Sequence, residues 1–182
     1  MSTSTWNIDT AHSGISFTVR HMVVSKVRGK FADWKGTLTL DEEHPAQAVV
    51  EVAINAASIE TGVADRDNHL RSADFLDAAQ YPQIAFRSTA VKPAAKDRFK
   101  LSGDLTIRGV TRPVSLDVEF GGRAQDPWGN LRAGYSARVR LERKDFGLQW
   151  NQLLEAGGVL VGEQVDVEIE LEAVKAAATA AA

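Results

Sequence analysis

The chain has 182 residues, enough for one domain, and 44% of them are apolar, which allows a sizeable core but supplies no run long enough to span a membrane. Its net charge of −3 comes from interspersed acidic and basic residues, which argues against nucleic acid as a partner. The chain contains no cysteine, and this excludes disulfides and thiolate metal sites. Because the first residues lack the features of a secretory signal, we expect a cytoplasmic protein.

Apolar and polar residues alternate with a period of two along most of the chain, which is typical of strands with one buried face. The clearest case is Val165, Val167 and Ile169, which alternate with Asp166 and Glu168. Turn-rich links between several such segments favour antiparallel neighbours. In chain order the pattern predicts eight strands, near residues 15–20, 30–40, 50–55, 84–86, 99–107, 114–120, 131–141 and 165–171.

Eight antiparallel strands with one apolar face form either a sandwich or a closed barrel, and closure removes the edges that invite aggregation. We therefore predict an all-β fold, an eight-stranded antiparallel barrel. A barrel of this size is either filled by side chains or holds one small ligand. Small residues on the apolar faces fit both interpretations, because they either leave space inside or offset large side chains opposite. They are Ser88, Ala90, Gly103, Ala133 and Ala137.

Two segments break the strand pattern and are predicted to cover one mouth of the barrel. The first, residues 61–82, contains "DRDNHLRSADFLDAAQYP" and predicts a short helix with Thr61 as its N-cap. The second, residues 143–158, is unusually apolar for a connection between two strands. Charged groups on the outside and apolar groups on the inside would suit a lid.

Five stretches in the same order resemble the signatures of the YceI-like family: "IDTAHSGISFTVRHM", "VRGKFADWKGTLTLD", "ASIETGVADRDNHLRSADFLDAAQYPQIAFRS", "LSGDLTIRGVTRPVSLDV" and "RKDFG". The resemblance covers nearly the whole chain, so we expect one domain over residues 5–174. The last residues, "KAAATAAA", are low in complexity and follow a strand-like run, which predicts a disordered tail over 175–182. It implies a lipocalin-like barrel with the helical segment at one mouth. It also implies an elongated apolar pore that binds a polyisoprenoid or similar long-chain amphipathic lipid, of the quinone or prenyl diphosphate class.

The predicted ligand-binding residues combine the apolar strand faces with the two lid segments, and His21, Arg66 and His69 are the candidates for headgroup contact. The full set is Phe17, Val19, His21, Phe31, Arg66, His69, Leu70, Phe75, Phe86, Leu101, Leu105, Val139, Phe146, Trp150 and Leu154.

Other functions stay open at this point. No nucleophile elbow, dinucleotide fingerprint or phosphate loop is present, so no catalytic residue is assigned and we expect no enzyme. An enzyme acting on a lipid or quinone headgroup would use His21, His69 or Asp67 as acid or base. A ligand-free barrel with a structural or stress-related role is the third hypothesis, beside the lipid-binding barrel and the enzyme. His12, His21 and His69 lack the spacing of a metal motif, so no metal or cofactor is expected. A homodimer is left open.

Overall fold

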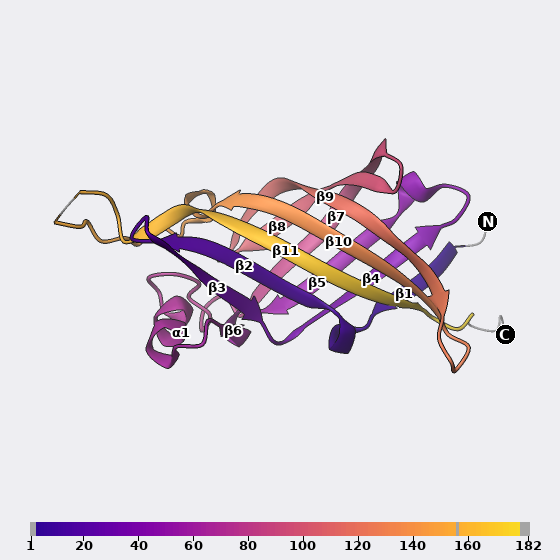
Figure 1. Ribbon diagram of the computed structural model, residues 1–182, viewed down its shortest axis with the longest axis horizontal. Helices are drawn as coiled ribbons and strands as arrows, with labels where there is room; N and C mark the ends of the chain where they lie inside the picture. Colours follow the sequence, from indigo (N-terminus) through magenta and orange to yellow (C-terminus); the bar gives the residue numbers. More distant parts are fainter. Residues whose placement is uncertain (1–2, 156, 179–182) are drawn as a thin grey trace.

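Within residues 3–155 and 157–178, which the computed structural model describes, nearly every long segment is a β-strand (Figure 1). No helix in these two ranges is long and apolar enough to cross a membrane. The strands are β1 (Thr3–Ile8), β2 (Gly14–His21), β3 (Ser25–Phe31), β4 (Trp34–Asp41), β5 (Val49–Asn55), β6 (Ile59–Glu60), β7 (Gln83–Ala95), β8 (Arg98–Ile107), β9 (Val110–Gln125), β10 (Leu131–Glu142) and β11 (Val161–Lys175). The helical elements in the same ranges are α1 (Ala64–Arg71) and the 3-10 turns η1 (Thr10–His12), η2 (Pro45–Gln47), η3 (Ala56–Ser58) and η4 (Arg143–Phe146).

Eight strands close into a ring of antiparallel neighbours, which confirms the predicted barrel. The order around the ring is β1, β4, β5, β7, β8, β9, β10 and β11, and β11 returns to β1. Closure depends on a short ladder in which Trp6 faces Lys175 and Ile8 faces Ala173. The closed part of the sheet therefore has no free edge.

At three places in the ring the chain bends, and a second strand beyond the bend extends past the closed part. β1 and β2 follow one another along the same edge of β11, with η1 between them. β3 and β4 are separated by Ala32 and Asp33, and β5 and β6 by η3. Beyond these bends β6 pairs with β3 but forms no ladder with β7, so the wall opens there. Helix α1 follows β6 and lies beside it at this end, as Figure 1 shows.

The period-two pattern sends one face of each strand inward and the other to solvent. On β11, Val165, Val167 and Ile169 line the interior of the barrel. Between them, Asp166 points outward and accepts a hydrogen bond of 2.7 Å from Arg140 Nε on β10. The acidic face of β11 is therefore paired with basic residues of its neighbour.

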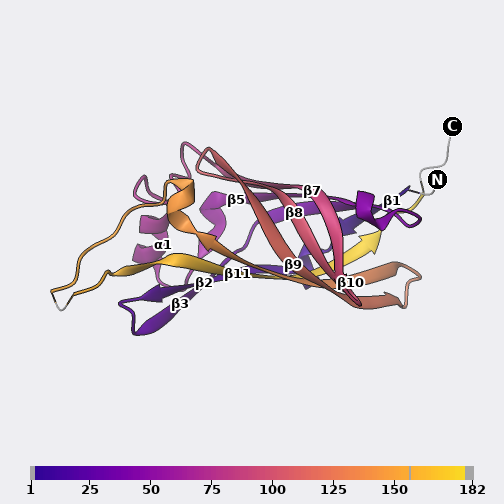
Figure 2. The ribbon, with the colours of Figure 1, turned by 90° about the horizontal axis from the view of Figure 1, so that it is seen from above.

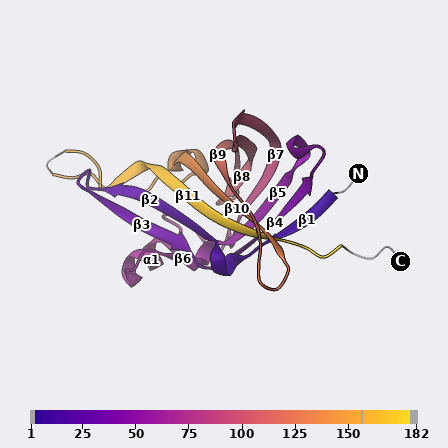
Figure 3. The ribbon, with the colours of Figure 1, turned by 45° about the vertical axis from the view of Figure 1, so that its right-hand side comes forward.

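The end of the barrel where β1 meets β11 is filled by a cluster around Trp6. The indole is 1% exposed and its Nε1 donates to Ser4 Oγ at 3.0 Å. Leu40, Ala133 and Ala173 complete the buried cluster. The start of β1 and the end of β11 lie on this side of the molecule, opposite α1, as Figure 3 shows. We call this end of the barrel the closed end.

Small residues inside the barrel accommodate large neighbours at two positions. A Cβ on Gly103 would lie 2.5 Å from the ring of Phe86, and a Cβ on Gly29 would lie 2.3 Å from the ring of Phe17. At Gly103, the second of the two interpretations left open by the sequence therefore applies: the small residue offsets a large one.

Gly103→Ala should lower the free energy of unfolding by about 1–3 kcal/mol, because the added methyl group overlaps both the Phe86 ring and the main-chain oxygen of Arg87. Urea unfolding measures the change. Gly14→Ala is the control, since nothing lies within 4 Å of a Cβ at Gly14, and it should shift stability by less than about 0.5 kcal/mol. Equal effects of the two substitutions would contradict the packing described.

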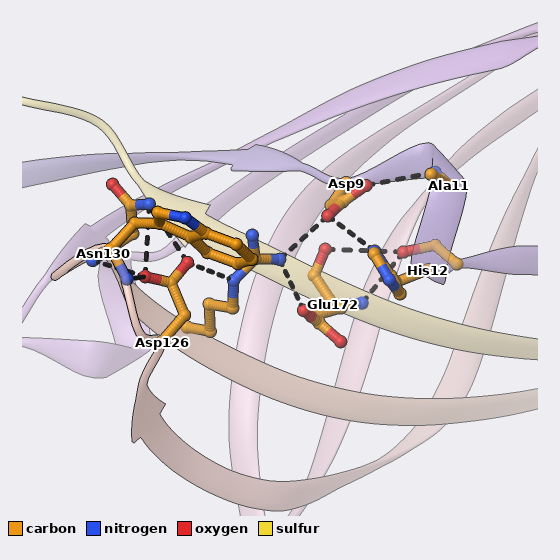
Figure 4. A network of polar contacts seen from close by, with 9 residues as sticks. Asp9, Ala11, His12, Asp126, Asn130 and Glu172 are labelled. Atoms are coloured by element: carbon orange, nitrogen blue, oxygen red, sulfur yellow. Dashed lines mark hydrogen bonds and ion pairs between the residues drawn. The ribbon is translucent and has the colours of Figure 1, made fainter.

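Next to the ring closure, Arg132 joins three carboxylates from different segments. They are Asp9, Asp126 and Glu172, which are labelled in Figure 4. Its Nη1 donates to Asp9 Oδ2 at 2.8 Å and to Glu172 Oε1 at 2.6 Å, and its Nε donates to Asp126 Oδ2 at 2.8 Å. The bonds from Arg132 and His12 lower the pKa of Asp9 from 3.8 to about 2. Arg132 likewise holds the pKa of Asp126 well below its usual range. The network ties β1, β11 and the β9–β10 loop together.

Asp9→Asn should reduce the loss of stability that accompanies acidification. The bonds to Asp9 favour its charged form, so their contribution is complete above pH 3.8 and disappears as the pH falls toward about 2. The measurement is urea unfolding at neutral pH, at about pH 4 and at about pH 2. In an Arg132→Met background the same substitution should have a smaller effect. If Asp9→Asn lost as much stability as the parent over this pH range, protonation of Asp9 would not contribute to the loss of stability in acid.

The C-terminal boundary differs from the sequence prediction. Lys175 belongs to β11 and faces Trp6, and the Ala176 amide donates to the Thr5 carbonyl at 2.8 Å. The first two residues of the expected tail, 175–182, are thus bound to β1, because the ladder that closes the ring extends to them. Residues 179–182 of that segment lie outside the described residues.

Candidate functional site

A cavity of about 940 Å³ occupies the barrel, and all eleven strands contribute side chains to its lining. The lining reaches from Ala48 and Ala173 at the closed end to His69 and Leu160 at the α1 end. The cavity is therefore elongated along the barrel. Its volume lies at the upper end of the range for small-molecule sites, about 300–1,000 Å³.

Fourteen of the fifteen residues predicted from the sequence line this cavity. The exception is Leu154, which lies in the loop between η4 and β11, where its amide donates to the Gly158 carbonyl at 3.1 Å. The loop pairs with itself through Leu153 and Val159 and projects from the barrel, so Leu154 does not reach the interior. The residues that line the cavity are Phe17, Val19, His21, Phe31, Arg66, His69, Leu70, Phe75, Phe86, Leu101, Leu105, Val139, Phe146 and Trp150.

The polar side chains of the lining gather at its two ends, and the long middle part is apolar. At the closed end they are Glu42, Arg123 and Tyr135, and burial raises the pKa of the Tyr135 hydroxyl. At the α1 end they are Arg20, His21, Thr61, Asp65, Arg66, His69 and Arg143. The cavity is therefore apolar along its length and polar at both ends.

Helix α1 is held at the mouth by a bond network that differs from the predicted cap. The helix begins at Ala64, and Val63 rather than Thr61 occupies the N-cap position. The Thr61 amide instead donates to Asp67 Oδ1 at 2.9 Å, and its hydroxyl bonds the same oxygen. Arg66 Nε donates to that hydroxyl at 2.7 Å. The carboxylate of Asp67, in the first turn of α1, thus bonds the residue that was expected to cap the helix, and Thr61 in turn holds Arg66 in the lining.

The two segments predicted as lids meet at His69. Its ring lies 4.6 Å from that of Trp150 and 5.1 Å from that of Phe75, both edge to face. His69 Nε2 lies 2.8 Å from Asp74 Oδ2, within hydrogen-bond distance. Arg108, on the β8–β9 turn, donates to the Phe75 carbonyl at 3.0 Å. The mouth is therefore built jointly by α1, the segment after it and the residues after η4.

Comparison with known proteins shows the family to which this barrel belongs. The family model of the YceI-like domain matches residues 6–173. The chain belongs to the YceI-like family. Protein YceI of Escherichia coli O157:H7 is 42% identical over 164 residues, which cover 90% of this chain and 82% of that protein.

Solved structures share the YceI-like fold. The crystal structure of BcnA from Burkholderia cenocepacia superposes with a TM-score of 0.80 at 22% identity, over 91% of this chain and 98% of that one. The structure of a polyisoprenoid binding domain from Saccharophagus degradans, implicated in plant cell wall breakdown, gives 0.66 at 14% identity, over 94% and 98% of the two chains. At these identities the likeness concerns the fold alone.

Within this YceI-like barrel, the sequence analysis missed the role of Arg143. The side chain is 5% exposed and donates to four main-chain carbonyls: Leu148 at 2.6 Å, Gly162 at 2.7 Å, Trp150 at 2.9 Å and Val161 at 3.4 Å. One cation thus holds both ends of the loop between η4 and β11 against the mouth. The only signal in the sequence is an arginine that opens the family stretch "RKDFG" within an apolar connection.

The histidines discussed as metal ligands have separate partners. His12 Nδ1 lies 2.9 Å from Asp9 Oδ2 at the β1–β2 bend, whereas His69 bonds Asp74 at the mouth. Two groups in the described ranges each bring three candidate ligands together: Asp9, His12 and Glu172, and Asp41, Glu43 and His44. In the first group Arg132 already bonds both carboxylates, and its charge opposes a cation there. That the protein needs no metal stays a prediction.

Arg143→Met should lower the free energy of unfolding by about 1–3 kcal/mol, because it leaves buried carbonyls without a donor. Amide hydrogen exchange should accelerate in residues 148–155 and 157–160, while strands β8 and β9 stay protected. Lys144→Met is the control, since Lys144 is exposed and, among the residues that the structure describes, forms an ion pair with Glu163 alone. It should cost less than about 0.5 kcal/mol. Indistinguishable effects of the two variants would remove the role assigned to Arg143.

Proposed function

We propose that the protein binds a long-chain amphipathic lipid of the isoprenoid type, with the tail in the barrel and the headgroup at the α1 end. The observation that carries the proposal is the elongated cavity of about 940 Å³, apolar along its length and polar only at its ends. Membership of the YceI-like family supports it. So does the related fold of the polyisoprenoid binding domain from Saccharophagus degradans.

Burial of the tail supplies the affinity. Each CH₂ group removed from water contributes about 0.8 kcal/mol, less the cost of ordering the chain and of association. The long strands allow many such groups, because the 15 residues of β11 extend for roughly 50 Å at about 3.3 Å per residue. Such a pore selects by length and width, and carries little information about the headgroup.

The headgroup is assigned to the α1 end for two reasons. The Trp6 cluster fills the closed end, whereas β6 and β7 leave the wall unpaired beside α1. Arg66 and His69 lie in the lining at that open side. A guanidinium suits the phosphates of a prenyl diphosphate or the carbonyl of a quinone, which are the two ligand classes we propose. Storage, sensing and transfer of the lipid all agree with this arrangement.

A binding protein fits the site better than an enzyme. Of the candidate acids and bases, Asp67 is bonded to Thr61 and His69 to Asp74. Both are thus engaged in holding α1 and the segment after it. A large apolar cavity also argues against the ligand-free barrel, since native interiors are normally close-packed.

Ala137→Phe should reduce lipid binding by filling the cavity that Ala137 lines. The purified protein is extracted with organic solvent and its lipid identified by mass spectrometry; the delipidated protein is then titrated with geranylgeranyl diphosphate and with ubiquinone. We expect a long-chain lipid in the parent and at least roughly tenfold weaker rebinding in the variant.

Ala53→Phe is the matched control. Ala53 lies on β5 between the lining residues Val52 and Ile54 but is not itself part of the lining, so the same bulk is added outside the barrel. It should bind like the parent. Absence of lipid from the extract together with no binding of either probe would overturn the proposed function.

A further inference from the structure

Five of the six large apolar side chains that are exposed in the described part of the chain lie at the α1 end. Four of them form what we call the tip: Met22, Val23 and Val24 in the β2–β3 turn and Leu153 in the loop between η4 and β11, with exposures of 44%, 66%, 86% and 82%. The fifth, Val63, precedes α1. The turn and the loop project beyond the barrel on the same side in Figure 1 and Figure 2. Isolated exposed apolar residues are ordinary, but a cluster marks an interaction site.

The turn at the tip is unfavourable for the free protein. Met22 and Val23 have φ values of 54° and 62°, in the left-handed region where glycine or asparagine is usual and a β-branched residue is an outlier. The Met22 amide donates to the Leu160 carbonyl at 2.9 Å, which ties the turn to the second loop. The sequence therefore places apolar side chains in a strained, exposed turn where polar residues would fit better.

All the charged side chains of the hairpin that carries the turn are basic. Residues 14–32 contain Arg20, Lys26, Arg28 and Lys30 and no acidic residue, in a chain of net charge −3. Arg20 and Lys26 face each other across the β2–β3 ladder, although like charges opposite one another are destabilising. An anionic surface would relieve this repulsion.

Nearby acidic groups neutralise only part of this charge. Glu60 lies 3.7 Å from Lys30, and Glu163 is paired with Lys144. Asp166 bonds Arg140, and the nearby charges of Lys26 and Arg20 also help to lower its pKa. Within the described ranges, Arg20, Lys26 and Arg28 form no ion pair. Glu155 follows Leu153 in the loop and is the one acidic residue close to the tip in sequence.

We propose that the tip docks on the surface of an anionic lipid bilayer, with its apolar side chains in the interfacial region and Lys26 and Arg28 against the lipid phosphates. Apolar insertion combined with basic residues is the combination that holds proteins at such surfaces. The cavity lining reaches His21 and Leu160, which are adjacent to the tip. Docking would therefore bring the open end of the cavity to the bilayer. The inference goes beyond the proposed function, because docking requires no particular ligand.

The test is flotation of the full chain with vesicles of phosphatidylcholine and phosphatidylglycerol, against vesicles of phosphatidylcholine alone. We expect the parent to bind the mixed vesicles, and to bind less as salt is added. The triple variant Val23→Ser, Val24→Ser, Leu153→Ser should bind at least about tenfold more weakly. Lys26→Gln with Arg28→Gln should remove most of the salt dependence. Trp128→Ser is the matched control, since Trp128 is 81% exposed on the β9–β10 loop at the other end.

Three outcomes would overturn the proposal: a parent that does not bind mixed vesicles, a triple variant that binds like the parent, and loss of binding in Trp128→Ser alone. A parent that does not bind the mixed vesicles is also the result expected if the tip binds a protein instead of a bilayer. Lipid extraction from the same samples tests the proposed lipid binding independently of docking. A parent that binds vesicles but yields no lipid supports docking and counts against lipid storage, and the reverse result counts against docking only.

Discussion

The structure depends on one short ladder, in which Trp6 to Ile8 pair with Ala173 to Lys175. A β-sheet of this size must satisfy its edge amides and carbonyls, and this ladder does so by closing the ring. The rest of the same edge of β11 is taken by β2 after the bend at η1. Because one edge serves two strands in succession, one end of the barrel is tight while the other flares.

The flared end is where the sheet alone cannot complete the wall. β6 turns away with β3, and residues 61–82 occupy the space between β6 and β7 along the chain. Their own bonds, such as those of Asp67 with Thr61 and of Arg108 with Phe75, replace the ladder that is missing there. A wall made of a short helix and two loops is held by fewer bonds than a sheet, so it is the part of the barrel best suited to open.

The sequence predicted the barrel and most of the cavity because both follow from a local rule. A period of two assigns each side chain to one face, and closure turns that face into an interior; Phe17 and Phe86 were placed in this way. The bends at η1 and η3 were not predicted, since they depend on which strands share a neighbour. Leu154 was misplaced because its loop projects outward. Arg143 was overlooked because its partners are main-chain carbonyls, which leave no trace in residue identity.

The pairing of the two terminal strands also governs how the chain can mature on the ribosome. β1 and β2 both need β11, which is synthesised after the other described strands of the barrel. At roughly 5–20 residues per second, the N-terminal strands wait on the order of ten seconds for their partner. During that interval the apolar faces meant for the interior have no enclosed space to occupy. Ring closure from such distant segments is intrinsically slow, so the nascent barrel exposes its apolar faces for longer than a fold built from local contacts would.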